Sequence, residues 1–274
     1  MTIDSHHHFW HYDPARHGWI SDEMAALRRD FLPADLEPIL TQNGVGGCVA
    51  VQADQSEAET EFLVRMADNY DFVRGVVGWV DLQAPDLASR LSHWAGVKAV
   101  KGFRHIVQAE PDDFLTRPAV MNGIRQLADL GFTYDILIYP NQLKAALHLV
   151  RAVPEVQFVI DHLAKPVIRK QEISRWSSFM AEIAKQPNVC CKLSGMVTEA
   201  GWQTWSKADF FPYLNVAFEQ FGPDRLLFGS DWPVCLVAGD YTQVKTIVED
   251  YVAPWGDEVR AKVFGANAER FYRL

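Results

Sequence analysis

The ten residues VGGCVAVQAD (45–54) carry the pattern that decides the fold. They form an almost unbroken run of small and β-branched apolar side chains, followed by polar ones. A strand with one face in solvent alternates between apolar and polar residues, whereas a strand covered on both faces stays apolar throughout. The run therefore predicts a strand of a parallel sheet that is buried on both faces.

Seven further stretches of the chain repeat this pattern. The eight predicted strands lie at 2–10, 45–54, 72–82, 97–106, 132–139, 156–163, 189–197 and 225–234. Amphipathic segments with ordinary helix start and stop signals lie between several of them. These predicted helices lie at 56–70, 117–131, 141–154, 174–187 and 209–222.

Eight strands that alternate with helices in 274 residues predict a distorted (β/α)₈ barrel of the TIM type. We expect one domain, residues 1–274, because the chain has no linker-like or low-complexity segment and no fixed-period repeat. An open doubly wound sheet is the structural alternative. Two long connections, 11–36 and 198–210, follow the first and seventh strands, at the barrel end where active sites are built.

Composition narrows the classes of partner. The chain has 35 acidic and 26 basic residues, a net charge of −9, which argues against a nucleic acid and an anionic membrane surface as partners. We expect neither a secretory signal nor a membrane span, because the first residues lack a charged segment followed by an apolar one and no run of about 18 apolar residues occurs. Its four cysteines lack CxxC spacing, so we expect reduced thiols in a cytoplasmic protein. Whether the protein forms a homo-oligomer is left open by the sequence.

Polar side chains gather at the ends of the predicted strands, beginning with three histidines in the first. Residues i and i+2 of a strand share a face, so His6 and His8 point together and His7 points away. Two imidazoles at this spacing can bind one divalent ion, because Zn–N bonds are about 2 Å long. Hydrogen-bonded structural histidines and the remnant of a purification tag are the alternatives.

Two further strand ends carry groups for acid–base chemistry. Asp231 ends the eighth strand, where a carboxylate can bind a metal, accept a proton from water, or do both in turn. The alternative role for Asp231 is that of a cap on the segment that follows it. His162 ends the sixth strand, with Lys165 just beyond it and Asp161 expected on the opposite face. A purely structural histidine is the alternative there.

Arg104 ends the fourth strand and is followed by His105. Its planar, permanently charged guanidinium suits a carboxylate or a polarised carbonyl oxygen. A salt bridge inside the barrel mouth, with Asp135 of the fifth strand as one partner, is the alternative. Glycine-rich phosphate loops and the GxSxG motif are absent, so covalent serine catalysis is not supported, even though Ser194 closes the seventh strand.

Four motifs in the same order resemble the amidohydrolase superfamily, and more narrowly its branch of sugar-lactone hydrolases. They are IDSHHHFW (3–10), GFRHI (102–106), DHLAKP (161–166) and LLFGSDWPV (226–234). The stretch DSHHHFWHYDPARHGWI (4–20) is especially similar to enzymes that open L-fucono- and L-rhamnono-lactones. The resemblance runs from Thr2 to the C-terminal NAERFYRL.

The resemblance implies a distorted (β/α)₈ barrel with its reaction at the carboxyl ends of the strands. It maps the family's metal and catalytic positions onto His6, His8, His162 and Asp231, and a substrate-binding arginine onto Arg104.

One departure concerns the metal. Many members carry a histidine at the end of the fifth strand, whereas FTYDILIYP (132–140) has none, and no lysine is placed to be a carboxylated bridge. This argues against two metals. We expect at most one zinc-like divalent ion on His6, His8 and Asp231, with metal-free catalysis left open because the branch includes metal-independent members.

The function that the resemblance implies is hydrolysis of a sugar lactone by an activated water. Asp231, His162 and Arg104 are the predicted catalytic residues. The predicted substrate contacts are His105, Trp19, Trp202, Lys165 and Trp232. A metal-dependent non-oxidative decarboxylase of the same superfamily is the enzymatic alternative, and a non-catalytic ligand-binding barrel is the alternative from another class.

Overall fold

The computed structural model describes residues 1–274, and its eight parallel strands form one sheet in the order of the chain. The strands are β1 (Ile3–His7), β2 (Gly47–Val51), β3 (Val73–Gly78), β4 (Val100–Ile106), β5 (Thr133–Leu137), β6 (Phe158–Ile160), β7 (Val189–Leu193) and β8 (Leu226–Phe228). Each predicted strand is present, although each is shorter than its apolar run.

The sheet closes on itself just beyond the last strand. The backbone N–H of Asp231 donates to the carbonyl of His6 over 2.9 Å, and that of His8 donates to Trp232 over 2.7 Å. These bonds join the residues after β8 to β1 and its continuation. The prediction of a distorted TIM-type barrel is therefore confirmed, and the open doubly wound sheet is wrong.

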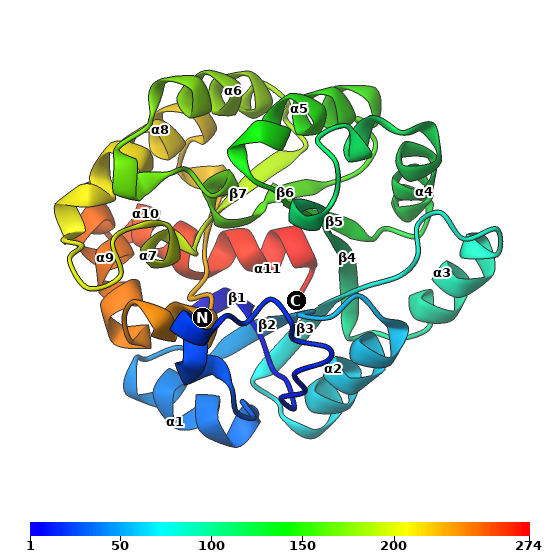
Figure 1. The fold of residues 1–274 in the computed structure, drawn as a ribbon, viewed down its shortest axis with the longest axis horizontal. Coiled ribbons are helices and arrows are strands. Elements are labelled where there is room, and N and C mark those ends of the chain that lie inside the picture. Colours follow the sequence, from blue (N-terminus) through cyan, green and yellow to red (C-terminus); the bar gives the residue numbers. More distant parts are fainter.

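Helices surround the strands, and α11 crosses the middle of the view (Figure 1). They are α1 (Pro33–Gln42), α2 (Glu57–Asn69), α3 (Leu87–Ala95), α4 (Pro118–Asp129), α5 (Leu143–Ala152), α6 (Ser174–Ala184), α7 (Met196–Glu199), α8 (Phe211–Phe221), α9 (Tyr241–Val252), α10 (Asp257–Ala261) and α11 (Asn267–Tyr272). All five predicted helices are present. Ser56 caps the first turn of α2, because its Oγ accepts from the N–H of Glu59 at 3.2 Å.

The connection after β1 ends earlier than predicted, because α1 begins at Pro33. The proline has no N–H to leave unpaired and its φ suits a first helical turn, so a helix begins there in spite of the polar residues around it. In Figure 1 this connection lies in front of the strands. None of the helices has the length and apolar character that crossing a membrane requires.

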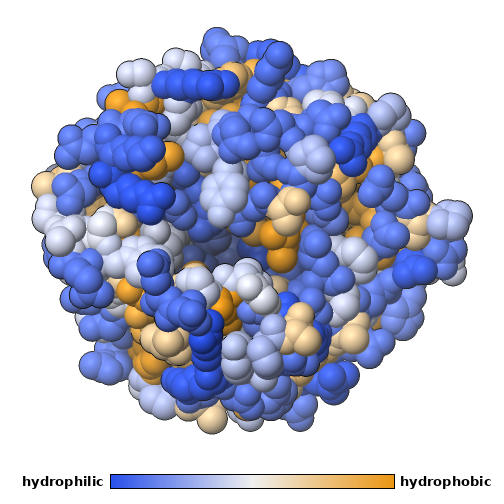
Figure 2. Space-filling view, in the orientation of Figure 1, coloured by the Kyte–Doolittle hydropathy of each residue, from blue (hydrophilic) through white to orange (hydrophobic).

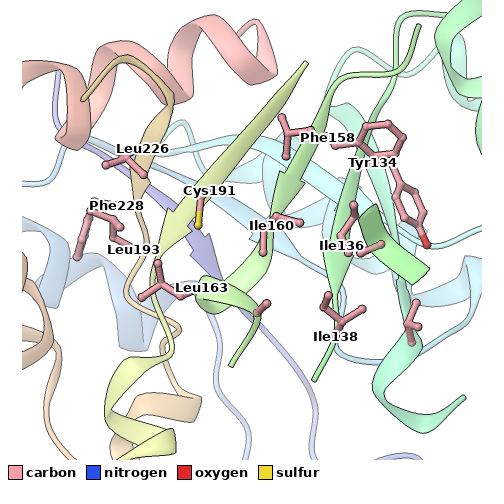
Figure 3. Packing of buried hydrophobic residues seen from close by; sticks show 14 of the residues in the cluster. Tyr134, Ile136, Ile138, Phe158, Ile160, Leu163, Cys191, Leu193, Leu226 and Phe228 are labelled. Atoms are coloured by element: carbon pink, nitrogen blue, oxygen red, sulfur yellow. The ribbon is translucent and has the colours of Figure 1, made fainter. Parts of the chain in front are cut away.

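The outer and inner faces of the barrel sheet pack in different apolar clusters. On the outer face, Ile136, Ile160 and Cys191 lie side by side on β5, β6 and β7 and belong to the main apolar core (Figure 3). Inside the barrel, a second apolar cluster joins strand residues to α11. Its members are Ile3, Val49, Val51, Val77, Val159, Leu227, Ala268, Phe271 and Tyr272. α11 therefore closes the amino-terminal end of the barrel and leaves the carboxyl ends of the strands for a site.

Candidate active site

Four predicted side chains meet at the carboxyl ends of the strands, and Figure 2 shows a hollow near the centre of the face in view. His6 Nε2 and His8 Nε2 lie 3.2 Å apart. Asp231 Oδ1 lies 3.9 Å from His6 Nε2, 3.4 Å from His8 Nε2 and 3.7 Å from His162 Nε2. All four residues are buried. The structure thus brings β1, β6 and β8 together around one carboxylate.

The backbone explains the directions of these side chains. His6 and His8 share a face of the extended chain, while His7 points away, packs against Phe9 and leaves both ring nitrogens without a partner. His162 and Asp231 have φ values of +53° and +58°, in the left-handed region. Non-glycine residues rarely adopt that conformation, and such strain is concentrated at functional sites.

The prediction that Asp161 points away from His162 is wrong. Asp161 Oδ1 lies 3.3 Å from His6 Nδ1, inside the barrel. Side chains alternate only while the chain stays extended, and β6 ends at Ile160, after which His162 turns left-handed. Two consecutive residues can therefore contribute to the same cluster.

Arg104 lies beneath this cluster and is 3% exposed. Its NH1 donates to Asp161 Oδ2 over 3.1 Å and lies 3.3 Å from His6 Nε2, while NH2 donates to the carbonyl of Gln52. The barrel-mouth salt bridge therefore exists, but its partner is Asp161 and not Asp135. The permanently charged guanidinium of Arg104 therefore lies beside His6.

Sequence reasoning missed Lys192, which is fully buried on β7. Its Nζ lies 2.6 Å from Asp135 Oδ2, 3.0 Å from Asp161 Oδ1 and 3.1 Å from His6 Nδ1. Tyr272 Oη, on α11, donates to the same Asp135 oxygen over 2.7 Å. The available signal was a lone charged residue inside the apolar strand VCCKL, because a fully buried lysine requires partners.

Ser194 also belongs to the site, since its Oγ lies 2.8 Å from His162 Nδ1. Gly195 follows with φ +60°, and a Cβ there would lie 2.5 Å from the same ring nitrogen. The two residues after β7 therefore hold the imidazole of His162 from behind, one by a hydrogen bond and the other by the absence of a side chain.

The electrostatics favour an ionised Asp231 beside a neutral His162. Burial by itself raises the pKa of Asp231, but its interactions with His162, His8 and Lys165 outweigh burial and hold that pKa below its usual value. Burial lowers the pKa of His162 well below its ordinary range, against the opposing charge of Asp231. Near neutral pH the site therefore presents an ionised carboxylate beside the uncharged ring of His162.

Three predicted substrate contacts lie on the loops that follow β1, β6 and β7. Lys165 Nζ is 2.9 Å from Glu199 Oε1 of α7. Trp202 is half-buried and donates to the carbonyl of Thr198 over 2.9 Å. Trp19 is 40% exposed, with its ring edge-on to Trp10. Each therefore stands at the end of the barrel that carries the site.

The other two predicted contacts are not brought to the site. His105 points to the other side of β4 from Arg104, where its Nε2 lies 3.0 Å from Glu110 Oε1 and its ring stacks on Phe114. Trp232 is 1% exposed and packs edge-on against Phe9 and Phe31. The contact of Trp232 with substrate stays a prediction, and its ring packs against Phe9 and Phe31.

The donor atoms of His6, His8 and Asp231 fit one divalent ion. Their separations of 3.2, 3.4 and 3.9 Å are close to the ligand–ligand edge of a tetrahedral zinc site, about 3.4 Å for bonds of about 2.0–2.1 Å. Asp231 Oδ2 is buried without a partner. His8 Nδ1 lies 2.8 Å from the carbonyl of Val51, a contact that turns the lone pair of its Nε2 toward the site.

A second group of donors, His6, Asp161 and His162, also lies close enough together to hold a metal ion. Its atoms already contact the ammonium of Lys192 and the guanidinium of Arg104. These two protein cations compete with an ion at that position, so the trio of His6, His8 and Asp231 is the better fit for one.

Comparisons with known proteins agree with this geometry. The profile of a family described as amidohydrolase matches residues 3–274. The chain is 37% identical to an L-fucono-1,5-lactonase of Burkholderia multivorans, over 100% of this chain and 96% of that protein. It is 27% identical to an L-rhamnono-gamma-lactonase of Scheffersomyces stipitis, over 64% of this chain and 59% of that protein.

The same resemblance holds in three dimensions. A crystal structure of an amidohydrolase from Burkholderia multivorans with bound zinc superposes with a TM-score of 0.97 at 37% identity, covering 100% of this chain and 99% of that one. The resemblance inferred from the four motifs is confirmed. The match to the family profile and the full-length identity establish that this chain belongs to the amidohydrolase family.

Proposed function

We propose that this protein hydrolyses a sugar lactone of the L-fucono- or L-rhamnono-lactone type to the open sugar acid. The observation that carries the proposal is the buried carboxylate of Asp231, which faces three imidazoles and keeps one oxygen, Oδ2, without a partner. An ionised carboxylate with a free oxygen at the end of a barrel is equipped to accept a proton from water.

The first step is attack of water on the carbonyl carbon of the ring ester. As the new C–O bond forms, Asp231 Oδ2 accepts the proton of the water, and the carbonyl oxygen becomes an oxyanion. The low pKa of Asp231 keeps it ionised for this step. General-base catalysis of this kind contributes about 10²–10⁴ in rate.

The second step breaks the bond between the carbonyl carbon and the ring oxygen. The leaving alkoxide takes the proton from Asp231, which returns the carboxylate to its starting state. His162 and the charge of Arg104 next to His6 are the protein groups near the developing oxyanion. Ser194 holds His162 in place through Nδ1.

Substrate contacts come from the loops at the same end of the barrel. We assign the apolar C–H face of the sugar to Trp19 and Trp202, and a hydroxyl or ring oxygen to the ammonium of Lys165. His105 is engaged with Glu110 and is left out of this assignment.

His6, His8 and Asp231 are the residues that would hold a divalent ion of the zinc class. When bound, such an ion supplies Lewis-acid polarisation of the carbonyl and eases ionisation of water.

The test is Asp231→Asn, assayed by acid release from L-fucono-1,5-lactone and L-rhamnono-lactone. The rate of spontaneous lactone opening at the same pH is subtracted. We expect kcat to fall by about 10²–10⁴ while the circular dichroism and melting temperature stay near those of the parent. Asp250→Asn, an exposed aspartate on α9, is the matched control. Near-normal turnover of the Asp231 variant, or carbon dioxide release from aromatic carboxylates without lactone opening, contradicts the proposal.

A further inference from the structure

The chain turns left-handed for four consecutive residues just beyond β6. His162, Leu163, Ala164 and Lys165 have φ values of +53°, +54°, +56° and +49°. The N–H of Lys165 donates to the carbonyl of His162 over 2.7 Å, so these residues form one turn of a left-handed helix. Left-handed residues that carry a Cβ normally occur singly, because each has a steric cost. A run of four, none of them glycine, therefore requires surrounding contacts that hold the turn.

The middle of the turn is anchored in the protein interior. Trp176 Nε1, on α6, donates to the carbonyl of Leu163 over 2.6 Å, and both residues are buried. The side chain of Leu163 packs in the main apolar core just beyond β6 (Figure 3). These contacts fix the backbone of the turn, so the directions of its first and last side chains are fixed with it.

The first and last side chains of the turn face the same side of the site. A helix with about three residues per turn places residues i and i+3 above each other. His162 Nε2 lies 3.7 Å from Asp231 Oδ1. Burial by itself lowers the pKa of Lys165, but its interactions with Glu199 and Asp231 outweigh burial and raise that pKa above its usual value. The left-handed turn therefore brings an imidazole and an ammonium to the side where Asp231 lies.

The loop after β7 holds both ends of the turn. Ser194 Oγ lies 2.8 Å from His162 Nδ1, and Lys165 Nζ donates to Glu199 Oε1 over 2.9 Å. Thr198 Oγ1 lies 3.4 Å from the same Glu199 oxygen. Glu199 is the one protein acceptor of the Lys165 ammonium, which has three N–H groups on a side chain that is 13% exposed. Two N–H groups are therefore left for a substrate.

The chemistry of lactone opening identifies the substrate atom that suits this ammonium. When the bond between the carbonyl carbon and the ring oxygen breaks, its electron pair goes to the ring oxygen, and Asp231 returns its proton to that atom. The ring oxygen therefore has to come within hydrogen-bond reach of Asp231, while the carbonyl oxygen already has His162 and Arg104. The ring oxygen of a lactone is a weak acceptor that becomes a strong one as it leaves. A cation there stabilises the transition state more than the bound substrate.

We propose that Lys165 is a catalytic residue whose ammonium donates a hydrogen bond to the leaving ring oxygen, and that Glu199 is a positioning residue that holds this ammonium in place. The inference rests on the proposed function and narrows the contact of Lys165 to one substrate atom. Lys165 stays protonated throughout, so the proton that neutralises the alkoxide still comes from Asp231.

The first test replaces one atom of the substrate. L-fucono-1,5-lactone is compared with the thiolactone that carries sulfur in place of the ring oxygen. A departing thiolate is a far weaker base than an alkoxide, and sulfur is a weak hydrogen-bond acceptor. Lys165→Met should lower kcat for the lactone by about 10²–10³, the effect of removing one preorganised donor, and kcat for the thiolactone by less than about 10-fold. KM for the lactone should change little, because the contact strengthens only as the bond breaks.

The second test addresses Glu199. Glu199→Ala should lower kcat for the lactone by at least about 10-fold, and kcat for the thiolactone less, because the ammonium loses the acceptor that fixes it. Glu199→Gln keeps an acceptor oxygen and should recover most of that loss. Glu182→Ala, which removes a solvent-facing ion pair with Lys185 on and beyond α6, is the matched control and should leave kcat unchanged.

The two substrates are assayed on one preparation of each variant. A partly unfolded variant loses both rates equally, so the ratio of the two rates reports the contact with the ring atom alone. Equal losses on both substrates, or a Glu199→Gln variant no more active than Glu199→Ala, overturn this inference alone when the parent opens the lactone. A parent that opens neither compound overturns the proposed function, and this inference with it.

Discussion

The imidazole of His162 shows how closely single residues shape this site. Ser194 Oγ holds its Nδ1 at 2.8 Å, and Gly195 leaves room for the ring. Gly195 has φ +60°, which a residue with a Cβ adopts at a cost of about 1–2 kcal/mol. The added Cβ would also stand 2.5 Å from the ring nitrogen, so the ring would have to move. Backbone strain and a steric collision therefore act at the same position.

We predict that Gly195→Ala lowers kcat for lactone opening by at least about 10-fold, because a displacement of about 1 Å can cost about 10² in rate. Gly44→Ala is the matched control, because Gly44 has φ +64° and nothing lies within 4 Å of its Cβ position. Both variants should lose similar stability in urea denaturation, and only Gly195→Ala should lose activity. Equal activity in the two would show that the collision does not move His162.

At the scale of elements, the connection after β1 is tied to α2. Arg16 NH2 lies 2.6 Å from Asp54 Oδ2 and 3.5 Å from Glu59 Oε2. Glu59 is buried and accepts from the N–H of Ala53 over 3.2 Å. Burial raises the pKa of Glu59 to about 7, against the opposing effects of Ala53 and Arg16. The contact between this loop and α2 therefore includes a carboxyl group that titrates near neutral pH.

This raised pKa predicts a pH-dependent stability. Between the ordinary glutamate pKa of 4.5 and about 7, the folded state binds more protons than the unfolded state, so Glu59 costs stability progressively as pH rises through that window. Glu59→Gln does not titrate, and should gain on the order of 3 kcal/mol relative to the parent between pH 4.5 and 8. Urea denaturation at both pH values measures this difference in the free energy of unfolding. Glu61→Gln, at an exposed position on the same helix, is the control. A difference that is constant with pH would contradict the prediction.

At the scale of the whole molecule, the barrel interior has three levels. The apolar cluster with α11 closes the amino-terminal end, the ion pairs of Lys192 and Arg104 occupy the middle, and the histidines with Asp231 lie at the other end. The charges in the middle are paired, which is the condition for burying them. A bound ion would therefore stabilise the folded barrel, because its ligands come from β1 and from beyond β8, which the unfolded chain separates.

We predict that zinc raises the melting temperature of the whole protein. At a free concentration of about 100 times its Kd, the gain is about 2.7 kcal/mol. For a chain of this size that corresponds to about 5 °C. His8→Asn should abolish the shift, and His148→Asn, an exposed histidine on α5, should keep it. Differential scanning calorimetry with and without a chelator measures the effect, and an equal shift in both variants would place the ion elsewhere.

The sequence predictions were correct where short-range patterns decide the structure, and they failed where contacts between distant residues decide it. The positions of β1 to β8 followed from apolar runs, and the shared direction of His6 and His8 followed from the two-residue repeat of a strand. The direction of Asp161 was predicted wrongly, because the left-handed backbone after β6 is invisible in the local pattern. Lys192 was missed, because its partners come from β1, β5 and β6.

By itself, the sequence determined the barrel, the end at which its site lies and the side chains that reach that end, since these follow from short-range periodicity and from the parallel order of the strands. Only the tertiary structure decided which cation accompanies which carboxylate and which nitrogen of His6 faces the site. Those choices depend on distances of about 3 Å between residues from different strands, far apart in the chain, and a hydrogen bond or an ion pair is made or lost at that scale.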